Sequence, residues 1–203
     1  MEPRNARVIL LAGPSGSGKS YIARKTGLPV LALDDFYKDG DDPTLPISDG
    51  VVDWDNPGAW HHNAALDAIA TICAGRPCEV PIYAIGADRR VGHRRFDLGR
   101  VTLFVAEGIF AADLVADCDR LGLLAGAYSL RRPRTVTYLR RLARDLSEKR
   151  KPPGLLIHRG YALMRAEPGI RDRQEGLGAR PASGRRILRE VAAMTPAASR
   201  TPA

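Results

Sequence analysis

The feature that most constrains this chain is the octapeptide at Gly13–Ser20, which reads Gly-Pro-Ser-Gly-Ser-Gly-Lys-Ser. It fits the pattern GxxxxGK[ST] in full, and it lies between a predicted buried strand, Arg7–Ala12, and a predicted helix, Ser20–Thr26. Glycines let the backbone curl so that consecutive N–H groups point at one anion, and the following helix adds its positive N-terminal dipole. A Gly- and Ser-rich surface turn is the alternative, but pattern, position and context together indicate a phosphate-binding loop.

The side chains of this loop predict a nucleotide with a metal ion. A lysine at the position of Lys19 reaches the β- and γ-phosphates of ATP, and a hydroxyl at the position of Ser20 binds Mg²⁺. We therefore expect ATP and Mg²⁺ as cofactors. The remaining phosphate contacts are expected from Gly13, Ser15, Gly16, Ser17 and Gly18.

Short apolar runs alternate with segments of helical periodicity along the rest of the chain. The predicted strands are Pro29–Leu33, Glu79–Tyr83, Val101–Ala106 and Ala127–Leu130, and the predicted helices are Ala59–Ala74, 111–121, 135–150, 155–165 and 184–194. This alternation predicts an α/β fold of the P-loop NTPase type, with a mostly parallel sheet covered by helices on both faces. We expect one domain over residues 1–194 and a disordered tail at 195–203, which is rich in Pro, Ala and Ser.

The net charge of +8 is concentrated in one segment, residues 131–151, which holds nine basic and two acidic side chains. Such a segment suits a polyanion, either a nucleic acid or the triphosphate of a nucleotide. The residues before it are acidic on balance, so we favour the triphosphate and expect no nucleic-acid partner.

Other compositional features predict a cytoplasmic protein. No run of about 18 apolar residues and no signal-peptide core is present, so no membrane partner is expected. The three cysteines form no CxxC pair, which favours reduced thiols over disulfides or a zinc site. The oligomeric state, a homo-oligomer included, stays open.

Carboxylates follow two of the predicted strands. Asp34 and Asp35 come directly after the second strand, and Glu107 ends the apolar run that begins at Val101. Ligands of doubly wound sheets bind at the carboxyl ends of the strands, so these groups should meet the γ-phosphate and its metal. We expect Asp34 to accept the proton of an acceptor hydroxyl, Glu107 to reach Mg²⁺, and Asp35 to hold a Mg²⁺-bound water. Turn formation by the two aspartates is the alternative.

Several short segments occur in an order that resembles one enzyme family. They are GPSGSGKS at 13–20, DDFYK at 34–38, DWDNP at 53–57, PIY at 81–83, FVAEGI at 104–109 and RRLARD at 140–145. The chain is similar in these segments to the uridine kinase / phosphoribulokinase family of P-loop kinases, and closest to the uridine–cytidine kinases, over about residues 5–150. The resemblance implies phosphoryl transfer from ATP to the 5′-hydroxyl of a nucleoside, and a helical lid at approximately residues 131–155.

The resemblance also implies roles for individual residues. Asp34 would be the base near the 5′-hydroxyl, Asp55 would hold the ribose 2′- and 3′-hydroxyls, and Tyr83 would lie against the base. On the lid, Arg144 would stabilise the transferring phosphoryl group and Arg140 would contact ATP. A turn at Asp55 and core packing of Tyr83 are the structural alternatives.

The chain also departs from this family in the region expected to read the base. The family has Asp after the Pro-x-Tyr tyrosine and a His a few residues later, where this chain has Ala84 and Asp88. Asp88 and Arg90 could still contact a base edge, with a different pattern of donors and acceptors. The alternatives are a kinase of nicotinamide riboside, a sugar phosphate, glycerate or pantothenate, and a non-kinase nucleotide switch or nucleic-acid-binding ATPase.

Overall fold

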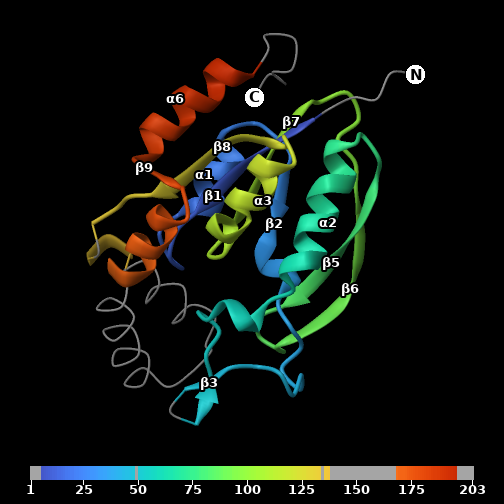
Figure 1. The fold of residues 1–203 in the computed structure, drawn as a ribbon, viewed down its shortest axis with the longest axis vertical. Coiled ribbons are helices and arrows are strands. Elements are labelled where there is room, and N and C mark those ends of the chain that lie inside the picture. Colours follow the sequence, from blue (N-terminus) through green and yellow to red (C-terminus); the bar gives the residue numbers. More distant parts are fainter. Residues whose placement is uncertain (1–5, 49, 134, 138–167, 196–203) are drawn as a thin grey trace.

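The core of the molecule is a five-stranded parallel sheet in the order β2-β7-β1-β8-β9. The computed structural model describes residues 6–48, 50–133, 135–137 and 168–195. The strands are β1 (Arg7–Ala12), β2 (Val30–Ala32), β7 (Leu103–Gly108), β8 (Leu124–Leu130) and β9 (Arg180–Ala182). Because β1 is the central strand, the loop that follows it opens at the middle of the carboxyl edge of the sheet (Figure 1).

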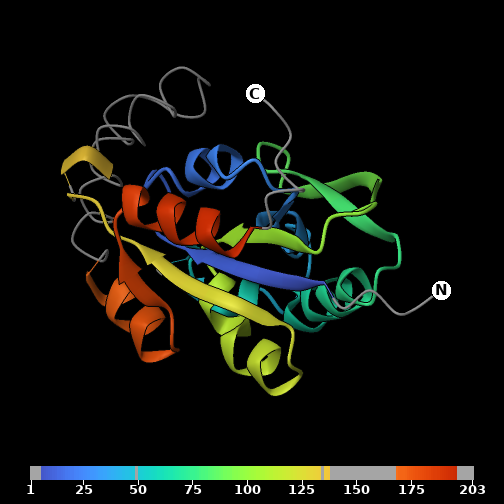
Figure 2. The same ribbon diagram turned by 90° about the horizontal axis from the view of Figure 1, so that it is seen from above.

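Helices cover both faces of this sheet, as predicted (Figure 2). The side chains of β1 alternate, so that Val8 and Leu10 join one apolar cluster while Ile9 and Leu11 join another. The second cluster includes side chains of α1 (Lys19–Lys25) and α6 (Gly184–Met194), and the first includes those of α2 (His62–Cys73) and α3 (Val115–Arg120). The α/β P-loop fold is therefore confirmed.

Helix α2 shows how the local sequence builds one of these layers. Its buried residues, Ala65, Ala68, Ile69 and Ile72, recur at helical spacing and form one apolar face toward the sheet. The helix ends at Cys73, and Gly75 follows with a positive φ of 72°, which a residue with a side chain rarely adopts. The prediction of this helix is confirmed within a few residues at each end.

The sequence-based prediction missed several elements. One is β6 (Arg89–Phe96), which pairs antiparallel with β5 (Cys78–Ala84). Its sequence, RRVGHRRF, has no apolar face, and it forms a strand because β5 supplies the partner. Also missed were β9, the helical residues 168–176, and the pair β3 (Ile47–Ser48) and β4 (Val51–Val52), which lie within residues 34–57, where abundant Asp, Gly and Pro predict an irregular loop.

Two further predictions lie wholly or largely outside the described residues. Most of the helix predicted at 135–150 and the whole helix predicted at 155–165 fall there, as does the tail from residue 196 onward. In the part of the chain that is described, no helix is long and apolar enough to cross a bilayer. Cys73, Cys78 and Cys118 are free thiols, and burial raises the pKa of Cys73 and Cys118 to about 12.

The core position of α2 yields a test of the fold. We expect Ile69→Ala to destabilise the protein by about 2–5 kcal/mol, because Ile69 is fully buried and the change leaves a cavity. Asp67→Ala, on the exposed side of the same helix, should change stability by less than about 0.5 kcal/mol. Urea denaturation of the two variants measures both values, and equal effects would contradict the orientation of α2 described here.

Candidate active site

The parallel register of the sheet brings the predicted carboxylates to the phosphate loop. Glu107 pairs with Leu11 of β1 on one side and with Ala32 of β2 on the other. Its strand therefore ends between the loop that begins at Gly13 and the segment that carries Asp34. This placement confirms that the carboxyl ends of β1, β2 and β7 meet at one edge.

The loop has the backbone conformation that an anion cradle requires. Gly16 and Gly18 have positive φ angles of 80° and 88°, and Gly18 is the N-cap residue of α1. The N-terminus of α1 therefore faces the loop with its free N–H groups. Ser17 is fully buried, and its Oγ has no hydrogen-bond partner among the described residues. An unpaired buried hydroxyl of this kind can donate to a phosphate oxygen.

Lys19 and Asp34 face each other across this edge. Lys19 is buried, and its Nζ lies 3.9 Å from Oδ2 of Asp34, whose side chain is about one-third exposed. Gly108 allows the approach, because a Cβ at that position would lie 2.8 Å from Cβ of Leu33 and 3.0 Å from Oδ1 of Asp34. The glycine after Glu107 therefore makes room for the turn η1 (Leu33–Phe36), which carries Asp34.

Glu107 is a buried carboxylate with one oxygen left unpaired. Burial raises the pKa of Glu107, while the Lys19 ammonium and a hydrogen bond from the Ser20 hydroxyl oppose that rise. Its Oε2 has no hydrogen-bond partner in the part of the chain that is described. A buried charge without a full set of partners is costly, and a cation beside Ser20 and Glu107 would compensate it.

These residues fit a magnesium ion held jointly with a nucleotide. Among the described residues no group of three or more His, Cys, Asp or Glu side chains is arranged to hold a metal by itself. Magnesium rarely uses such an all-protein cage, and it is commonly bound by one or two side chains together with waters and substrate phosphates. The Ser20 hydroxyl and Oε2 of Glu107 form a ligand set of that kind.

Asp35 does not join this group, although it was predicted beside the metal. Its carboxylate accepts a hydrogen bond of 3.2 Å from the backbone N–H of Tyr83 and lies 3.6 Å from the guanidinium of Arg94. Burial raises the pKa of Asp35, and these two contacts oppose the rise. In the tight turn of η1 consecutive side chains point in different directions, so Asp34 faces the phosphate loop and Asp35 faces the β5–β6 hairpin.

Aromatic side chains line the region next to Asp34. The ring of Tyr37 lies 5.6 Å from that of Trp54, 5.9 Å from that of Tyr83 and 5.9 Å from that of Phe110. Burial raises the pKa of Tyr37 well above its usual value, and the charges of Asp34 and Asp55 raise it further. The two carboxylates predicted to contact the acceptor therefore both act electrostatically on the Tyr37 hydroxyl.

Tyr83 lies in the protein interior. Its ring is buried, and its hydroxyl donates a 2.9 Å hydrogen bond to the carbonyl of Lys38. This arrangement ties the hairpin to the segment after η1. It favours the packing role that the sequence left open over direct contact with a base.

Asp88 and Arg90 lie where the hairpin meets the segment after η1. Asp88 has a positive φ of 47°, and its carbonyl accepts a hydrogen bond from the N–H of Gly40. The backbone N–H of Arg90 donates to Asp39. Backbone groups of both residues therefore attach the hairpin to the segment after η1.

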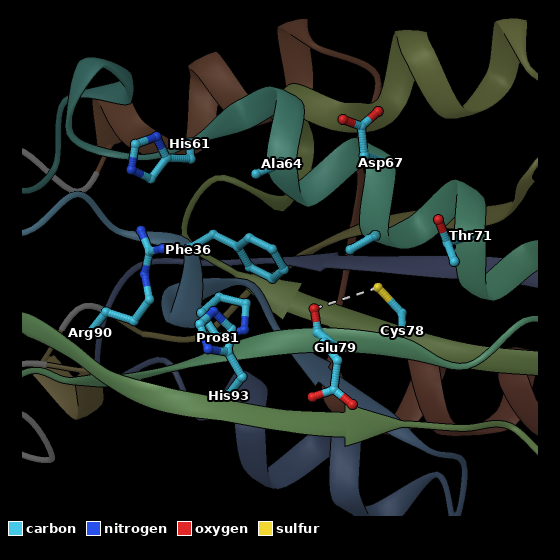
Figure 3. A pocket seen from close by; sticks show the side chains of 11 residues that line it. Phe36, His61, Ala64, Asp67, Thr71, Cys78, Glu79, Pro81, Arg90 and His93 are labelled. Atoms are coloured by element: carbon cyan, nitrogen blue, oxygen red, sulfur yellow. Dashed lines mark hydrogen bonds between the residues drawn. The ribbon is translucent and has the colours of Figure 1, made fainter.

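The side chain of Arg90 points into a groove between α2 and the hairpin (Figure 3). The groove has a volume of about 360 Å³, with His61 and Arg90 at one end and Thr71 and Cys78 at the other. Its lining includes Phe36 but no residue of the phosphate loop and not Asp34. It is therefore a separate cavity behind η1, and a base contact by Arg90 has no support from this geometry.

Several functional predictions lie beyond the described residues. Arg140 and Arg144, with most of the predicted lid at 131–155, fall in the segment 138–167. The structure instead reveals a buried polar pair that sequence reasoning did not find, Ser129 and Gln174. The only signal in the sequence was a polar residue on the apolar side of a short helix, which is too weak to interpret without the fold.

Comparisons with known proteins agree with this arrangement. No protein-family model matches the chain. A uridine kinase of Tolumonas auensis is 29% identical over 155 residues, which cover 70% of this chain and 69% of that protein. An inorganic pyrophosphatase of Arabidopsis thaliana is 29% identical over 164 residues, which are 76% of this chain but 24% of the length of that protein. The chain thus spans about a quarter of one relative and about two thirds of the other.

The chain is similar in sequence to uridine kinases. A crystal structure from Silicibacter, named as a fructose transport system kinase, covers 91% of this chain with a TM-score of 0.62 and 17% identity. At that identity the likeness supports the fold alone.

The buried state of Glu107 yields a prediction about the stability of this protein. Its raised pKa means that the folded protein binds the proton more tightly than the unfolded chain, so ionisation of Glu107 destabilises the fold. We expect Glu107→Gln to raise the free energy of unfolding at pH 7 by on the order of 1 kcal/mol while lowering activity. The gain over the wild type should shrink as pH falls through the carboxyl range, because the wild-type side chain is then neutral too.

Thermal unfolding of both proteins between pH 4 and pH 8, measured without nucleotide, tests this. If Glu107→Gln is less stable than the wild type at pH 7, the protein already offsets the cost of burying the ionised Glu107 side chain.

Proposed function

We propose that this protein transfers the γ-phosphoryl group of ATP to the 5′-hydroxyl of a nucleoside and forms the nucleoside monophosphate. The observation that carries the proposal is the pairing of Lys19 with Asp34 at 3.9 Å, which sets a carboxylate opposite the phosphate loop. The charges of Asp34 and Asp55 both act on Tyr37, whose ring contacts that of Trp54, the neighbour of Asp55. A pair of carboxylates suits an acceptor with several hydroxyl groups better than the single water molecule that an ATPase uses.

In this mechanism each described residue has a distinct task. The N–H groups of the loop and the Lys19 ammonium bind the β- and γ-phosphates and offset their charge. Asp34 accepts the proton of the acceptor hydroxyl, and Asp55 accepts hydrogen bonds from the ribose diol. Ser20 and Glu107 would hold Mg²⁺, which would supply further charge neutralisation at the phosphates. The lid predicted at approximately residues 131–155 would close over the phosphates, with Arg140 and Arg144 contributing positive charge.

One observation favours a second candidate, a small polyol or sugar without a base. Tyr83 is buried with its hydroxyl occupied, and Arg90 lines the groove behind η1. Neither side chain is then placed to recognise a base, although Asp34 and Asp55 could still bind hydroxyls.

A panel of acceptors separates these candidates. With Mg²⁺·ATP, release of ADP should require an acceptor, and ribonucleosides should react faster than 2′-deoxyribonucleosides because loss of one hydroxyl leaves Asp55 underpaired. Asp55→Ala should erase that preference. Faster turnover of simple sugars than of any nucleoside would select the second candidate, and ADP release independent of every acceptor would reject both.

A pair of substitutions in η1 tests the assignment of the base. Asp34→Asn cannot accept the proton, so kcat should fall by roughly 10²–10⁴-fold with little change in ATP affinity. Asp35→Asn keeps the acceptor for the Tyr83 N–H and loses only the charge pair with Arg94, so its loss should be much smaller and added Mg²⁺ should not restore it. Steady-state kinetics over a range of Mg²⁺ concentrations measures both. If Asp35→Asn were the inactive variant, the two roles would have to be exchanged.

A further inference from the structure

The helical residues 168–176 attach to the carboxyl edge of the sheet mainly through polar contacts. Ion pairs join Arg173 to Asp113 of η3 (Ala111–Leu114) and Glu175 to Arg131 at the end of β8. Between these two residues lies Gln174, which is fully buried. The helix therefore presents one uncharged amide to the interior and charged groups on either side of it.

Both ends of the Gln174 amide are used. Its Nε2 donates a 2.9 Å hydrogen bond to the carbonyl of Ile109, and its Oε1 accepts a 3.1 Å hydrogen bond from Oγ of Ser129, which is also fully buried. An amide can donate and accept at once, and these two contacts fix its orientation. Buried polar pairs of this kind specify one arrangement of the elements that they join.

The two partners of Gln174 belong to the strand ends that form the active site. Ile109 is two residues beyond Glu107, and Ser129 pairs in register with Ala12, the residue before Gly13. One side chain thus connects the strand that carries the unpaired carboxylate with the edge from which the phosphate loop begins. The spacing between Glu107 and Ser20 depends on how these strand ends are held.

We propose that Gln174 is a positioning residue for the magnesium site, holding the end of β7 so that Glu107 faces Ser20 and the phosphates. The inference rests on the proposed function, because it assigns Glu107 to the metal. The Ser20 hydroxyl donates a hydrogen bond to the Glu107 carboxylate, but Oε2 has no hydrogen-bond partner among the described residues, so its direction depends on how the end of β7 is held. Groups that orient metal ligands from behind change metal affinity when they are removed.

The competing explanation is that Gln174 stabilises the fold and nothing more. The two explanations differ in the effect that they predict on the Mg²⁺ concentration needed for nucleotide binding. A purely stabilising amide would lower the unfolding temperature on substitution without changing the Mg²⁺ concentration that nucleotide binding requires.

The experiment compares Gln174→Met with Arg173→Ala as a matched control on the same helix. Met fills the space without hydrogen bonds, and Ala removes the ion pair with Asp113 but leaves the amide in place. For each folded protein, binding of a non-hydrolysable ATP analogue is titrated by calorimetry over a range of Mg²⁺ concentrations. We expect Gln174→Met to raise the Mg²⁺ concentration for half-maximal binding by roughly 10–100-fold. Arg173→Ala should leave it close to the wild-type value.

Ser129→Ala keeps the proposal testable if Gln174→Met does not fold. It deletes one oxygen and leaves the donation to Ile109 intact, so it should shift the Mg²⁺ requirement in the same direction by a smaller factor. Unchanged Mg²⁺ dependence in both the Ser129 and the Gln174 variants, or equal shifts in Gln174→Met and Arg173→Ala, would overturn the positioning role.

Glu107→Gln in the same assay separates this inference from the proposed function. If Glu107→Gln shifts the Mg²⁺ dependence and Gln174→Met does not, only the role of Gln174 is overturned. If Glu107→Gln has no effect, the metal assignment of Glu107 is overturned, and the role of Gln174 with it.

Discussion

The arrangement of the active site depends on one buried carboxylate, Glu107, placed beside the ammonium of Lys19. The protein holds this charge at the end of a strand that is paired on both sides, and the side chain is buried. Lys19 and the Ser20 hydroxyl offset part of the cost, and burial still raises the pKa of the carboxyl. Such incomplete compensation is typical of a site built for a cation that arrives with its substrate. The stability that the ionised Glu107 side chain is expected to cost the protein is the consequence of keeping this ligand position open.

Around this pair, the segment after β2 is held by contacts that leave Asp34 beside Lys19 of the phosphate loop. Asp35 engages Tyr83 and Arg94 of the hairpin, and the backbone of Asp88 and Gly40 closes the same junction. These contacts explain why two adjacent aspartates of identical chemistry have different environments. They also make the β5–β6 hairpin part of the scaffold that supports η1, the turn that carries Asp34.

The opposite side of the site is held by a polar contact from the C-terminal part of the chain. Gln174 reaches the backbone two residues beyond Glu107 and the side chain of Ser129. The groove between α2 and the hairpin contains none of the residues predicted to bind phosphate. The residues proposed to act in the reaction therefore lie at the strand ends and not in this groove.

The sequence by itself determined the phosphate loop, the alternation of strands and helices, and the strand ends where Asp34 and Glu107 lie. These follow from local pattern, because a glycine-rich turn between a strand and a helix, and an apolar run of fixed period, need no distant partner to be recognised. Only the tertiary structure decided that Asp35 turns to Arg94, that β6 forms a strand despite its charges, and that Gln174 meets Ser129. Each of these depends on a partner between 45 and 59 residues away or on another strand, and sequence spacing carries no information about which distant groups the folded chain brings into contact.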